Sequence, residues 1–240
     1  MTASRNRHAA AAGSFHGLFW CALGKMACAI TLAVIQHVGT SGNGAVVAAF
    51  LVTLAAMTSL VIADWAYISR LTRFSSDPKW LTYSRSAGVG TIVTLAGLIG
   101  MFIGAVMLSV FAPLDWSAGV SVGSRCVLTA AAVAAIGIFL VYIRISQMCA
   151  TCARVYRSRV LQRSAGHVLR CFWALLGAAA ATGTLFLLVG GLAAPGLLAR
   201  LLDVVTIAVQ GFGLYCLVVH LILLIRTAGV LDIAATEEGS

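Results

Sequence analysis

Six long apolar segments divide this chain of 240 residues, and they constrain its fold more than any other feature. The segments cover approximately residues 15–38, 45–69, 86–111, 120–143, 167–191 and 197–226. A helix needs about 20 apolar residues to cross roughly 30 Å of hydrocarbon, and each segment is long enough. Because backbone polar groups in lipid must be paired within the protein, each segment is predicted to be a transmembrane α-helix.

The composition points to the same class of protein. Hydrophobic residues make up 61% of the chain and charged residues only 10%, and the mean hydropathy is +1.01. A soluble domain of this composition would lack the polar residues that cover a water-exposed surface. The predicted fold class is therefore an all-α polytopic membrane protein, a bundle of six transmembrane helices arranged as three hairpins.

The distribution of basic residues predicts how the helices are oriented. Thirteen of the 16 lysines and arginines lie in the N-terminal tail, the linker after the second span, the segment from Arg144 to Arg170, or the end of the sixth span. The opposite loops and span ends contain only Arg125 and Arg200. Basic residues concentrate on the cytoplasmic side of membrane proteins, so both termini are predicted to be cytoplasmic.

The segment 144–170 is the most basic part of the chain and contains no acidic residue. Apolar residues recur at helical spacing beyond residue 143, which predicts an amphipathic extension of the fourth span over residues 144–166. Its basic face is expected to bind the anionic cytoplasmic leaflet or an acidic partner. The expected binding residues are Arg144, Arg154, Arg157, Arg159, Arg163 and Arg170. Nucleic acid is not an expected partner, despite the net charge of +9, because the basic residues flank apolar spans.

The remaining segments are short and polar. Residues 1–14 are expected to form an N-terminal tail, and residues 227–240 a C-terminal tail. In the linker after the second span, Asp77 and Pro78 have the residue types of a helix N-cap and a first helical position, which predicts a short helix there.

Small residues in two spans indicate close helix packing. The third span contains Gly97, Gly100 and Gly104, and the fifth contains Gly177, Ala181 and Gly183. In lipid, helices associate largely through such close backbone approach. Two uses are open: self-association into a homo-oligomer, or packing within one chain.

Two charged residues lie within the first and second spans, Lys25 and Asp64. A charge in the bilayer interior costs at least about 2.5–3.5 kcal/mol on insertion scales, so each needs a partner. In an antiparallel pair of spans the two are offset by roughly 9 Å along the axis, which a lysine side chain can largely cover. The sequence predicts an ion pair, direct or through water, that is either a gated proton or ion relay or a structural staple.

Gln210 and His220 in the sixth span are expected to complete a polar interior with Lys25 and Asp64. His16, His167 and His220 are expected toward one side of the membrane, where a pair of histidines can ligate a b-type haem. Histidines at span ends are common without haem, and no cofactor or metal is predicted.

The seven cysteines are not expected to form disulfides, since none lies in the interior of an outer loop. Cys149, Cys152 and Cys171 lie beside the basic membrane face, where S-palmitoylation occurs. The alternative is that they are small apolar residues of the packing.

No catalytic motif or paired carboxylates are found, and only seven residues are acidic, so no enzymatic activity is expected. The leading interpretation is a small transporter or channel, or an integral subunit of a membrane complex. The alternative is a structural or adaptor protein that binds anionic lipid or an acidic partner. A haem-dependent redox protein is the remote third possibility.

The orientation can be tested directly. An epitope tag inserted at Gly42 or Pro195 is expected to be accessible only from the side opposite to both termini, because the loops there are poor in basic residues. Antibody labelling of intact and permeabilised cells measures this. Accessibility of either tag from the same side as the termini would show the orientation to be wrong.

Overall fold

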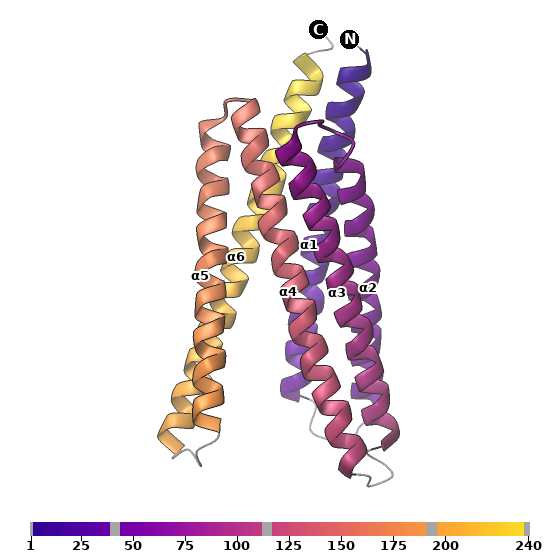
Figure 1. Ribbon diagram of the computed structural model, residues 1–240, viewed down its shortest axis with the longest axis vertical. Coiled ribbons are helices and arrows are strands. Elements are labelled where there is room, and N and C mark those ends of the chain that lie inside the picture. The colour runs from indigo at the N-terminus through magenta and orange to yellow at the C-terminus, as the bar shows by residue number, and fades with distance from the viewer. Residues whose placement is uncertain (1, 39–43, 112–116, 191–195, 238–240) are drawn as a thin grey trace.

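The computed structural model of the protein describes residues 2–38, 44–111, 117–190 and 196–237, and it consists of six α-helices (Figure 1). The helices are α1 (Thr2–Val38), α2 (Gly44–Leu71), α3 (Pro78–Phe111), α4 (Ser117–Val155), α5 (Arg159–Gly190) and α6 (Gly196–Glu237). There is no strand among the described residues, which confirms the predicted all-α class. All six helices are long and apolar enough to cross a membrane.

Consecutive helices run in opposite directions, and the two termini lie at the same end of the bundle (Figure 1). Helix α1 packs against α2 and α6, α3 packs against α4, and α5 packs against α4 and α6. The main apolar core lies in the half of the bundle that contains the termini. Toward the other end, α5 and α6 diverge from α3 and α4 (Figure 1). The side of the membrane on which this end lies stays a prediction.

Both expected tails are helical where the structure describes them. Helix α1 begins at Thr2, and α6 continues to Glu237. The reason is tertiary packing: Ala11 and Ala12 of α1 and Leu231 of α6 are buried in the main core. The composition of these segments predicts polar tails. It contains no information about the packing of α1 against α6, which makes both segments helical.

The predicted helix start at Asp77 and Pro78 is confirmed, but the helix is not short. Asp77 Oδ1 accepts a hydrogen bond from the backbone N–H of Lys79 at 2.8 Å, as an N-cap does. Pro78 is the first residue of α3, which runs to Phe111 without a break. The linker helix and the third span are therefore one element.

The predicted extension of the fourth span is confirmed as far as Val155. Arg157 then adopts a left-handed conformation with φ 51°, and the N–H of Ser158 donates to the carbonyl of Ala153 at 3.0 Å. This hydrogen-bond pattern closes a helix C-terminus. Residues 159–166, which were expected in the extension, instead form the first turns of α5.

The glycines of α3 pack against α4 within the chain. A Cβ atom at Gly97 would lie 2.4 Å from the backbone nitrogen of Ala134, and one at Gly104 would lie 2.7 Å from the Val127 side chain. Gly177 and Gly183 of α5 have no neighbouring atom within 4 Å of such a position. The small residues of α3 thus serve intramolecular packing. The predicted turns at residues 39–43, 112–116 and 191–195 lie outside the described residues.

This contact predicts a contrast between two glycines. Gly97→Ala should destabilise the protein by about 1–3 kcal/mol, because the added methyl group meets the α4 backbone, which cannot move aside cheaply. Gly177→Ala, a matched change on α5, should leave the melting temperature unchanged or raise it. Thermal unfolding in detergent measures both. Equal melting temperatures for the two variants would contradict the α3–α4 contact.

Candidate functional site

Lys25 of α1 and Asp64 of α2 form a direct ion pair. The Lys25 ammonium donates a hydrogen bond to Asp64 Oδ2, and the two side chains are only 6% and 4% exposed. The predicted pairing is therefore present and needs no bridging water. Each charge compensates the other, as a charged group in a bilayer requires.

Tyr142 of α4 forms the next contact of the buried lysine. The Lys25 Nζ atom lies 5.2 Å from the centroid of the Tyr142 ring, within the range of a cation–π interaction. The Cys21 side chain, one turn before Lys25 on α1, lies beside the Asp64 carboxylate. The ammonium group thus contacts side chains from α2 and α4.

The contacts continue from Tyr142 to α6. The ring of His220 lies 4.8 Å from the Tyr142 ring, and His220 Nδ1 is 3.2 Å from the hydroxyl oxygen of Ser146. His220 and Ser146 are completely buried, and Phe172 of α5 packs against the histidine ring at 5.7 Å. The resulting cluster is called here the polar core and consists of Asp64, Lys25, Tyr142, His220 and Ser146.

Two buried atoms of the polar core lack a hydrogen-bond partner among the described residues. They are Asp64 Oδ1 and His220 Nε2. An unpaired buried polar atom costs about 1–3 kcal/mol, more when it is charged. Native proteins contain few such atoms, and each calls for an explanation such as a bound ion, a water molecule or a catalytic role. The contacts described above form a series from Asp64 through Lys25 and Tyr142 to His220. The two unpaired atoms belong to the residues at its two ends, Asp64 and His220.

The space beside the ion pair is closed in this conformation. It is lined by Val61, Thr91, Thr94, Ile138 and Val141 together with the ion pair, and it has no room for a water molecule. The hydroxyl groups of Thr91 and Thr94 donate to carbonyl oxygens of their own helix. Asp64 is therefore enclosed on this side by its neighbouring helices.

The other predicted polar residue, Gln210, does not join the polar core, since it is exposed on α6. Sequence analysis also missed Tyr142 and Ser146. A tyrosine near the end of a span is typical of the membrane interface, so Tyr142 carried no distinct signal. Tyr142 and Ser146 are four residues apart, which places both on one face of α4. This spacing is the only sequence feature that indicates a shared polar site.

Five of the six arginines expected to bind lipid or a partner are exposed: Arg154, Arg157, Arg159, Arg163 and Arg170. Arg144 differs because it is half-buried. Its guanidinium carbon lies 5.9 Å from the Tyr83 ring centroid, and Nη1 donates to Gln147 Oε1 at 2.9 Å. Arg144 is thus engaged in contacts between α3 and α4.

The three candidate lipidation sites, Cys149, Cys152 and Cys171, are all buried. Burial favours the packing interpretation, because an enclosed thiol is not accessible to an acyl donor. His16 and His167 are exposed, while His220 is enclosed by aromatic rings, so the haem alternative gains no support from their placement. No group of three or more potential metal ligands occurs among the described residues.

The fold and the six apolar helices define the chain as an integral, multi-pass membrane protein. No protein-family model matches the sequence, and neither a curated protein nor a solved structure is detectably similar to it.

The ion pair predicts a non-additive effect on stability. Lys25→Met or Asp64→Leu alone should cost about 3–5 kcal/mol, because each leaves a buried charge without its partner. The double variant should recover most of this loss, since an apolar pair replaces the charged one. Melting temperatures of the four proteins in detergent form a double-mutant cycle. Additive losses would show that the two charges do not interact.

Proposed function

We propose that this protein is a small proton-coupled transporter and that its polar core is the proton-binding element. The observation that carries the proposal is the pair of unpartnered buried atoms, Asp64 Oδ1 and His220 Nε2. They lie in one series of contacts that crosses from α2 through α1 and α4 to α6. If the cluster served only to hold the helices together, a hydrogen bond to each of these two atoms would make it more stable. The two unpaired atoms therefore favour a role beyond stability.

The residue types of the polar core suit proton handling. Carboxylate and imidazole groups bind and release protons, and the hydroxyl groups of Tyr142 and Ser146 both donate and accept hydrogen bonds. Ionisable groups within membrane spans commonly mark proton or ion pathways. Protonation of Asp64 would neutralise the charge that holds Lys25, and this would weaken the link between α1 and α2.

This change in charge provides a coupling mechanism. In the closed conformation the Lys25–Asp64 pair ties α1 to α2, and no water reaches it. A proton that binds Asp64 from one side would release this tie and allow the helices to separate. Deprotonation toward the other side would restore the pair. A solute that binds only when the pair is broken would then move in step with the proton.

A second candidate function is that of a membrane adaptor. Five exposed arginines lie between the last turn of α4 and Arg170 of α5, and no acidic residue lies between residues 144 and 170. Such a surface favours anionic lipid headgroups or an acidic partner protein. In this case the polar core would serve as a staple.

Proton flux through the reconstituted protein tests the first proposal. Purified protein is placed in liposomes that contain a pH-sensitive dye, and a proton gradient and a membrane potential are imposed. Wild-type protein should acidify the lumen faster than empty liposomes do. Asp64→Asn should reduce the rate about tenfold or more, since the amide cannot exchange the proton. Tyr142→Phe, which keeps the ring beside Lys25 but removes the hydroxyl group, should also lower the rate.

Asp232→Asn is the matched control, because Asp232 is an exposed acid of α6 outside the polar core. It should conduct protons as the wild type does. Full flux through the folded Asp64→Asn variant would exclude the polar core as the proton-binding element. A wild-type rate equal to that of empty liposomes would contradict proton movement through the polar core and favour the adaptor function.

A further inference from the structure

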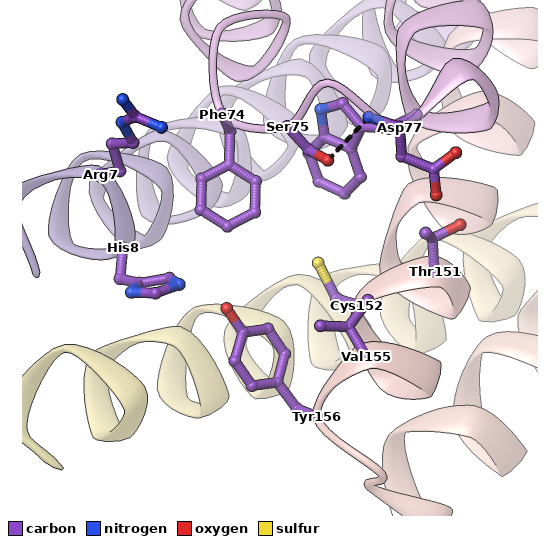
Figure 2. Close-up of a pocket in the computed structure, with 10 residues that line it drawn as sticks. Arg7, His8, Phe74, Ser75, Asp77, Thr151, Cys152, Val155 and Tyr156 are labelled. Atoms are coloured by element: carbon purple, nitrogen blue, oxygen red, sulfur yellow. Dashed lines mark hydrogen bonds between the residues drawn. The ribbon is translucent and has the colours of Figure 1, made fainter. Parts of the chain in front are cut away.

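A pocket of about 290 Å³ lies near the end of the bundle that contains the termini, apart from the polar core (Figure 2). It is formed by the first turns of α1, the connection between α2 and α3, and the last turns of α4. Because α2 ends at Leu71 and α3 begins at Pro78, this connection joins two spans at the membrane boundary. The pocket is therefore expected at the depth of the lipid headgroups.

Aromatic rings form much of the pocket wall. The Phe74 ring lies 5.3 Å from the Trp80 ring and 5.7 Å from the His8 ring, and Tyr156 lies 6.0 Å from His8. The Trp80 indole N–H donates to the carbonyl of Leu71 at 2.7 Å, and the side chain is only 1% exposed. This part of the wall is thus held rigidly before any ligand binds.

Charges of opposite sign stand at opposite sides of the pocket. Figure 2 shows Arg7 and His8 at one side and the Asp77 carboxylate, near Thr151, at the other. The carboxylate is positioned by the start of α3, where Asp77 Oδ1 caps the helix and the Asp77 N–H donates to Ser75 Oγ at 3.2 Å. Arg7 is exposed, so its guanidinium can turn toward a ligand.

We infer that this pocket binds a primary ammonium–phosphate zwitterion. The ammonium group would be bound by the Asp77 carboxylate, and the electron-rich faces of the surrounding rings favour a cation as well. The phosphate would be bound by Arg7, whose planar guanidinium matches phosphate oxygens. Tryptophan and tyrosine are typical of the headgroup region, which agrees with the placement of Trp80 and Tyr156.

This chemistry has two sources, the headgroup of phosphatidylethanolamine and free phosphoethanolamine. The full-length protein in detergent is titrated with dihexanoyl phosphatidylethanolamine, dihexanoyl phosphatidylglycerol and phosphoethanolamine, and binding is followed by tryptophan fluorescence and by the melting temperature. Phosphatidylethanolamine should bind about tenfold more tightly than phosphatidylglycerol, which lacks the ammonium group. Binding of phosphoethanolamine with equal affinity would identify a soluble ligand, and much weaker binding would identify the lipid.

Two variants separate the charges of the ligand. Asp77→Asn retains the helix cap, because asparagine caps helices as well as aspartate does. It should lower the affinity for phosphatidylethanolamine about tenfold and abolish the preference over phosphatidylglycerol. Arg7→Gln should weaken the binding of both lipids. Asp232→Asn, a change at an exposed acid of α6 that does not line the pocket, is the matched control and should bind as the wild type does.

Equal wild-type affinity for the two lipids would overturn the inference. So would an unchanged preference in a folded Asp77→Asn variant. If that variant does not fold, unaltered binding by Arg7→Gln, a change at an exposed side chain, would overturn it instead.

Discussion

The burial of Lys25 and Asp64 is the constraint on which the arrangement of this bundle depends. Neither charge can remain inside a bilayer without a partner, so α1 and α2 must bring the two side chains together. Lys25 also contacts Tyr142 of α4, and the Tyr142 ring contacts His220 of α6. The ion pair and the ring contacts beside it therefore connect four helices, α1, α2, α4 and α6.

Two kinds of contact hold the helices, and they occur in different places. Helices α3 and α4 approach closely through Gly97, Gly104 and Gly137, where a methyl group would collide with the facing helix. The half of the bundle around the polar core is filled instead by a large apolar cluster with members from all six helices. The backbones of α3 and α4 are thus in close contact. The buried ion pair links α1 to α2.

Several features were predictable because each depends on a local pattern. The length of the apolar segments predicts the six helices, and Asp77 followed by Pro78 predicts the start of α3. The Lys25–Asp64 pairing was predictable as well, because two opposite charges in adjacent spans have few other partners. The ends of α1 and α6 were not, since residues 2–14 and 227–237 are helical through their mutual packing rather than their composition.

By itself, the sequence determined the class of the protein, the approximate limits of its spans and the need to pair two buried charges. These follow from hydropathy and from the cost of a charge in lipid, which act residue by residue. The sequence also predicted His220 in this polar interior, but only the tertiary structure decided that Tyr142 and Ser146 join it while Gln210 stays exposed. The rotation of each helix about its axis decides which side chains meet, and it is set by packing between residues far apart in the chain.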